Sequence, residues 1–196
     1  MSMKAETAEE YLKGPRMRSK PRRGHALTAS TLGTFTGLRV DPAALDANLI
    51  NIPDIAHSLS LQCRFGGHCK EFYSVAQHSV EVSRQVPAEF ALWGLLHDAS
   101  EAYLCDLPRP VKALFPEYKK LELEIQEIIA AYFGLPWPMP KEIHIADAVE
   151  LLTEAKCFHE VPVYDSELTH RQTPLISQAP VFAERSFLQR YKELTR

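Results

Sequence analysis

Apolar residues along this chain recur mainly at helical spacing, which predicts a series of helices joined by short connectors. The helical stretches cover about residues 51–63, 74–86, 87–104, 117–134, 141–158 and 183–194. Residues 34–40 instead have the Thr, Phe and Val content that is typical of a short extended or hairpin segment. Because strands do not alternate with helices, the pattern predicts an all-α bundle with one short extended segment near its N-terminal end.

Helix-start and helix-stop residues agree with this division. Asn51 and Pro53 open one helix, Ser74 can cap the next, Pro87 begins a third, and Gly134 follows the last apolar position of a fourth. The proline-rich stretch before residue 117 and the segment from about 160 to 178 are expected to be loops.

Charge divides the chain into two parts. Residues 1–30 carry seven basic and three acidic residues, and we expect them to form a flexible basic tail. A nucleic-acid-binding arm is the less favoured alternative, because no aromatic residues are interleaved with the charges. Residues 31–196 form the predicted folded domain and are acidic, with fifteen basic and twenty-two acidic residues. We therefore expect no nucleic-acid polymer as a partner.

Composition and cysteine spacing indicate the cellular compartment that we expect for the protein. The chain is 45% apolar and 24% charged, and it contains no apolar run near the roughly 18 residues that a membrane span needs. Its N-terminal residues show no secretory signal pattern. The four cysteines are irregularly spaced and are expected to be reduced thiols. These features predict a cytoplasmic protein that has no membrane partner.

The strongest chemical signal is an adjacent pair, His97 and Asp98, that ends the apolar run Trp-Gly-Leu-Leu in a predicted buried helix. Burying such a pair is costly unless it is fully paired or binds a metal. His78 on the preceding helix and Asp147 on a later one also interrupt apolar faces. Together the four residues predict a mixed nitrogen and oxygen site for one divalent transition ion such as Mn, Co, Fe, Ni or Zn.

The order His78, His97-Asp98, Asp147 resembles the signature of the HD-domain metal-dependent phosphohydrolases. Longer strings resemble the bacterial HD-domain 5'-deoxynucleotidases and, more closely, their phage and prophage-type relatives. These strings are residues 64–68, 73–79 and 97–112. The resemblance extends over most of the chain after the tail and implies an HD-domain helical bundle in which the four residues are the metal ligands.

The resemblance also implies roles for residues beside the metal. Glu101, one helical turn after the pair, matches the acid that positions or deprotonates the attacking water or protonates the leaving oxygen. Arg64 matches the arginine that holds the substrate phosphate. Asp106 matches an acid near the sugar, and Lys112 is a weaker candidate for binding phosphate. With the ligand Asp98, Glu101 and Arg64 make up the expected catalytic set.

The chain departs from the family pattern at one point. After the arginine, the deoxynucleotidases carry a tryptophan that helps to exclude ribose, whereas this chain has Phe65 followed by two glycines and His68. Phe65 and His68 are therefore candidate substrate contacts. The sequence leaves open whether ribose or deoxyribose is preferred and whether monophosphates or triphosphates are hydrolysed.

These expectations point to a metal-dependent phosphohydrolase that cleaves (deoxy)nucleoside 5'-monophosphates with metal-activated water. A triphosphohydrolase is one alternative, which a basic rim of Arg109 and Lys112 would favour. A non-catalytic module that senses nucleotides or binds a partner is another, although such a module would not need Glu101 or Arg64. Because relatives form dimers or larger assemblies, the resemblance also implies a homo-oligomer.

Overall fold

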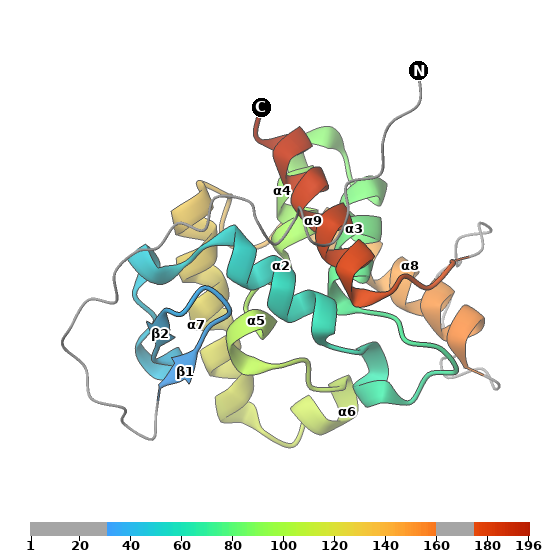
Figure 1. Ribbon diagram of the computed structural model, residues 1–196, viewed down its shortest axis with the longest axis horizontal. Coiled ribbons are helices and arrows are strands. Elements are labelled where there is room, and N and C mark those ends of the chain that lie inside the picture. The colour runs from blue at the N-terminus through green and yellow to red at the C-terminus, as the bar shows by residue number, and fades with distance from the viewer. Residues whose placement is uncertain (1–30, 160–174) are drawn as a thin grey trace.

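The computed structural model describes residues 31–159 and 175–196, and the described chain is mostly helical (Figure 1). Its α-helices are α2 (Ile52–Leu61), α3 (Val75–Gln85), α4 (Ala91–Leu96), α5 (Glu101–Leu104), α6 (Arg109–Lys112), α7 (Pro116–Phe133), α8 (Lys141–Phe158) and α9 (Pro180–Leu194). Short 3-10 helices are η1 (Pro42–Ala44), η2 (Ala47–Leu49), η3 (Arg64–Gly67) and η4 (Ala88–Phe90). The predicted mostly helical architecture is confirmed. The predicted basic tail, and most of the loop expected before α9, lie outside the described residues.

The expected extended segment is a small hairpin of strands β1 (Leu32–Gly33) and β2 (Arg39–Val40), which pair antiparallel. The turn of the hairpin is hydrogen-bonded to α2. Asp54 accepts from the backbone N–H of Thr36 at 2.7 Å and from the Thr36 hydroxyl at 2.8 Å. Asn51 caps α2 as predicted, accepting from the Asp54 N–H at 2.9 Å. One aspartate thus joins the hairpin to the helical bundle.

Helix α3 lies at the centre of the bundle and packs against α2, α4, α8 and α9 (Figure 1). Helix α4 approaches α3 closely at Gly94, where an added Cβ would lie only 3.0 Å from the Cα atom of Ser83. Next to it, Trp93 is fully buried and donates its indole N–H to the Pro136 carbonyl at 2.8 Å. This contact fixes the position of α4, whose last residue precedes the predicted His-Asp pair.

The prediction of a single helix over residues 87–104 is wrong, because the structure has three shorter helices there, η4, α4 and α5. The backbone keeps right-handed helical angles at His97 and Ser100, but its hydrogen bonds tighten to i→i−3, as in the bond from Glu101 N–H to Asp98 O at 3.0 Å. The His97 carbonyl accepts instead from the Gln126 amide on α7 at 3.2 Å. In this tighter turn, residues three apart share a face.

The other helix boundaries lie closer to the predicted ones. Helix α7 ends at Gly134 in the left-handed conformation, as predicted, and α8 matches the predicted 141–158. Helix α6 forms inside the expected proline-rich loop, and α9 begins at Pro180, three residues before the expected start. Within the described ranges, no helix is long and apolar enough to cross a membrane.

Candidate metal centre and adjoining pocket

The four predicted ligands come together from three places in the fold. His78 lies on α3, Asp147 lies on α8, and His97 and Asp98 lie in the turn after α4. His78 Nε2 is 3.2 Å from both His97 Nε2 and Asp147 Oδ1, and one ligand atom from each of these three residues lies within 4.8 Å of the others. Asp98 Oδ2 is 3.1 Å from His97 Nε2. The donor atoms therefore converge on one point.

Hydrogen bonds on the outer side of each imidazole turn its Nε2 towards this point. His97 Nδ1 donates to the Gly94 carbonyl at 2.8 Å, and His78 Nδ1 donates to Glu154 Oε1 at 2.6 Å. In the neutral form of each ring Nε2 is then the unprotonated nitrogen, and two such nitrogens 3.2 Å apart repel unless a proton or a metal ion lies between them. Metal-ligating histidines are held in this way.

The electrostatics of the cluster also favour a cation. Burial and the charge of Arg64 lower the pKa of His78, but Glu154 and Asp147 outweigh both and raise it to about 10. Burial raises the pKa of Asp98 and of Asp147, but the two histidines outweigh burial and hold both carboxyls well below their usual pKa. Positive charge is therefore stabilised where the donors meet, and the donor set fits a divalent metal ion.

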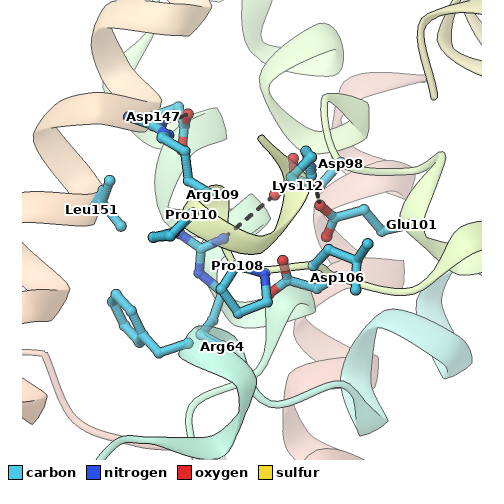
Figure 2. A pocket seen from close by; sticks show the side chains of 12 residues that line it. Arg64, Asp98, Glu101, Asp106, Pro108, Arg109, Pro110, Lys112, Asp147 and Leu151 are labelled. Atoms are coloured by element: carbon cyan, nitrogen blue, oxygen red, sulfur yellow. Dashed lines mark hydrogen bonds and ion pairs between the residues drawn. The ribbon is translucent and has the colours of Figure 1, made fainter. Parts of the chain in front are cut away.

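A pocket opens beside the cluster (Figure 2). Its walls come from η3, the His-Asp turn, the loop around α6, and α8. They are formed by Arg64, Phe65, Asp98, Glu101, Asp106, Leu107, Pro108, Arg109, Pro110, Lys112, Asp147 and Leu151. The pocket thus joins two of the candidate metal ligands to nearly all the residues that the sequence associates with substrate.

Glu101 is 4% exposed, and its two carboxylate oxygens differ in their partners. Oε1 lies 3.5 Å from Lys112 Nζ, whereas Oε2 has no hydrogen-bond partner among the described residues. Burial and the neighbouring Asp98 and Asp106 raise the pKa of Glu101 well above its usual value, although Lys112 and Arg64 act in the opposite direction. Glu101 lines the pocket, and a buried carboxylate with an unused acceptor oxygen is suited to exchange a proton with a ligand or a water.

The three pocket cations are not equally available to a substrate. Lys112 Nζ lies 2.5 Å from Glu122 Oε1 and also faces Glu101, so that two carboxylates already hold it. Arg109 is the most open, with 69% of its side chain exposed and Nη2 3.9 Å from Asp147 Oδ2. No local sequence pattern predicts the Lys112–Glu122 pair.

Arg64 is buried and anchored at one end. Its Nε and Nη2 donate to Glu154 Oε2 at 3.2 and 3.0 Å, and its Nη1 lies 3.9 Å from Asp98 Oδ2 on the pocket side. Figure 2 shows the guanidinium directed across the pocket towards Asp98. Glu154 was not predicted from the sequence, although its position seven residues after Asp147 places both on one face of α8.

The remaining candidates occupy different positions. Asp106 lines the pocket, and its backbone N–H donates to Gln62 Oε1 at 2.7 Å. Phe65 also lines the pocket and has a left-handed φ of 57°, an uncommon conformation for a bulky residue. Its ring meets His159 edge to face, with centroids 4.5 Å apart. His68 is exposed and is not part of the pocket wall, so the structure does not bring it to the site.

Comparison with known proteins finds two uncharacterized relatives. The chain is 39% identical over 171 residues to protein YfdR of Escherichia coli K12, which covers 85% of this chain and 96% of YfdR. It is 36% identical over 131 residues to a protein of Rhodobacter capsulatus, which covers 60% of this chain and 65% of that protein. No protein-family model matches the chain. Neither relative's name states an activity, so function has to be argued from the site.

Proposed function

The chain belongs to the same family as the uncharacterized protein YfdR, and we propose from its own site that it is a metal-dependent phosphohydrolase with an HD-domain fold. Its substrates are (deoxy)nucleoside 5'-monophosphates, from which it releases orthophosphate. The proposal draws on the order of His78, His97-Asp98 and Asp147 along the chain.

One observation carries the proposal. Glu101, whose Oε2 has no hydrogen-bond partner among the described residues, lines the same pocket as Asp98 and Asp147. Because residues 98 and 101 are joined by an i→i−3 backbone bond, the carboxylate follows the metal ligand at the spacing of one tight turn. A structural metal site would need the ligands, but it would not need a buried carboxylate with an unused oxygen beside them.

The residues divide the work of hydrolysis as follows. His78, His97, Asp98 and Asp147 would hold a divalent ion, which polarises a phosphoryl oxygen and lowers the pKa of water. Glu101 Oε2 receives a proton from the attacking water, and Lys112 holds the other oxygen of the same carboxylate. After the P–O bond breaks, the protonated Glu101 can return that proton to the leaving oxygen of the sugar.

Three further groups suit a nucleotide. Arg64 presents Nη1 on the pocket side, where its charge would offset the phosphate charge that accumulates during displacement. Asp106, whose pKa is raised by burial and by Asp98 despite Arg64, lies on the same wall and can accept a hydrogen bond from a sugar hydroxyl. The Phe65 ring offers an apolar surface for the nucleoside.

The proposal is tested by phosphate release from ribo- and deoxyribonucleoside mono-, di- and triphosphates with added Mn²⁺, Co²⁺, Mg²⁺ or Zn²⁺. We expect orthophosphate from the 5'-monophosphates and a loss of at least about a hundredfold in both Asp98→Ala and Glu101→Gln. Glu89→Gln, which changes an exposed glutamate of η4, serves as the matched control and should retain wild-type rates. Absence of turnover across the whole panel would refute the proposal.

A triphosphohydrolase is the second candidate, and one observation favours it. Arg109 is exposed at the pocket rim, where it could meet phosphates beyond the first. Lys112, the other half of the basic rim, is already held by Glu101 and Glu122, which weakens this candidate. Release of tripolyphosphate instead of orthophosphate would distinguish it.

A further inference from the structure

Glu154 lies outside the predicted ligand set and outside the pocket wall, yet it touches both halves of the site. It is completely buried on α8. Its Oε1 accepts from His78 Nδ1 at 2.6 Å, and its Oε2 accepts from Nε and Nη2 of Arg64 at 3.2 and 3.0 Å. One carboxylate therefore contacts a candidate metal ligand with one oxygen and the candidate phosphate-binding side chain with the other.

We infer that Glu154 is a positioning residue that sets metal affinity through His78 and phosphate affinity through Arg64. This inference rests on the proposed function. On the first side, a carboxylate acceptor keeps a proton on Nδ1 of His78 and so leaves Nε2 free to face His97 and Asp147. On the second side, it engages two of the three guanidinium nitrogens and leaves Nη1 towards the pocket.

The replacement Glu154→Gln distinguishes this role from simple filling of space. Both oxygens of Glu154 face N–H donors, whereas a glutamine side chain has one acceptor and one donor. If its amide nitrogen faces His78, the ring must move its proton to Nε2, which can then no longer bind a metal. If it faces Arg64, donor meets donor and the guanidinium is displaced. Neither orientation satisfies both neighbours.

Glu150 provides a matched control. It is another completely buried glutamate on α8, one turn before Glu154, and it contacts Gln85 on α3. It is not part of the pocket wall. Glu150→Gln therefore measures what the loss of a buried carboxylate on this helix does to the site in general.

The test measures binding of Mn²⁺ and Co²⁺ by calorimetry and the visible absorption of bound Co²⁺, with no nucleotide present. We expect Glu154→Gln to weaken metal binding by about 10- to 100-fold and to change the Co²⁺ spectrum, whereas Glu150→Gln stays within about threefold of wild type. If folded Glu154→Gln binds the ions as tightly as wild type, the inference is wrong.

Arg64→Met separates the two sides of Glu154. It removes the guanidinium but leaves the carboxylate free to accept from His78, so metal binding should be unchanged or tighter, while binding of inorganic phosphate to the metal-loaded protein falls. Glu154→Gln should weaken both. If Arg64→Met weakens metal binding as much as Glu154→Gln does, the effect is general damage to the fold, and the positioning role is excluded.

A second variant and the behaviour of the wild type keep this inference testable separately from the proposed function. If Glu154→Gln does not fold, Glu154→Asp keeps both acceptors on a shorter side chain, and it should still weaken metal binding; wild-type affinity there would contradict the inference. A wild-type chain that binds the ions but hydrolyses no nucleotide would refute the proposed function and leave the metal half of the inference standing. A wild-type chain that binds none of these ions would refute both.

Discussion

The charge of Glu101 depends on a balance between burial and neighbouring charges of both signs. Burial, Asp98 and Asp106 raise its pKa well above the usual value, and Lys112 and Arg64 oppose them. Lys112 itself is held in place by Glu122. Burial therefore favours the protonated form of this carboxyl and Lys112 favours its charged form, and a general base has to change between the two.

Replacement of Lys112 by methionine should therefore change the pH dependence of hydrolysis. The ammonium stabilises the charged form of Glu101, so its loss raises the pKa of that carboxyl further. Because a base must be deprotonated to act, the acidic limb of the profile of kcat/KM against pH should move to higher pH. The measurement is the rate of phosphate release from pH 5 to 9.

Lys120→Met is the control for this experiment. Lys120 lies on α7 with 79% of its side chain exposed, and its Nζ is 3.8 Å from Glu124 Oε1. It should leave the profile unchanged. An acidic limb that stays in place in Lys112→Met would show that Glu101 is not the group that titrates in the reaction.

Helices α3 and α4 determine the distance between the two candidate histidine ligands, because His78 is on the first and His97 follows the second. They approach each other closely at Gly94, whose carbonyl also accepts from His97 Nδ1. Glycine at this position thus has two effects: its missing side chain lets the backbones approach, and its carbonyl orients the ring.

Gly94→Ala should separate the two helices. The new Cβ would lie 3.0 Å from the Ser83 backbone and 3.1 Å from Val86 Cγ2, and backbone atoms cannot move aside as a flexible side chain does. We expect a loss of about 1–3 kcal/mol in the free energy of unfolding, measured in urea, together with weaker binding of Mn²⁺. Gly33→Ala, where an added Cβ meets nothing within 4 Å, is the control. Equal metal affinity in Gly94→Ala would show that the spacing of α3 and α4 does not control the site.

The sequence predicted most of the helices and the association of the four candidate ligand residues because both leave a local signal. His78 and Asp147 interrupt apolar faces, and a buried polar group needs a partner. The break after α4 leaves no such signal, since the torsion angles stay helical and only the hydrogen bonds change. Glu154 and Glu122 were missed because their roles depend on which distant side chain packs against them, and that is decided by tertiary structure.

Across the whole molecule, the site concentrates negative charge in a fold that is already acidic. Four carboxylates line the pocket, and Glu154 is buried outside the pocket wall. Arg64 is bonded to Glu154, and Lys112 is bonded to Glu122. The arrangement therefore stabilises added positive charge, and protons and metal ions compete for the same place.

This competition predicts how stability depends on pH. In the metal-free chain, the pKa of His78 is raised from 6.5 to about 10: burial and Arg64 lower it, but Glu154 and Asp147 outweigh them. A raised pKa contributes stability that is complete below pH 6.5 and is lost as the pH rises towards 10. With chelator present, the free energy of unfolding should therefore fall between pH 7 and 9.

Added Mn²⁺ should reverse this trend, because a metal ion must displace the proton that His78 otherwise holds. The stabilisation that the ion provides should grow with pH, by up to about 1.4 kcal/mol per unit for each proton displaced. Urea unfolding at pH 6.5, 7.5 and 8.5, with chelator or with Mn²⁺, measures both effects. Asp147→Asn, which removes one ligand charge, should lose most of the metal increment. An increment that is independent of pH in the wild type would mean that the ion binds somewhere other than between these histidines.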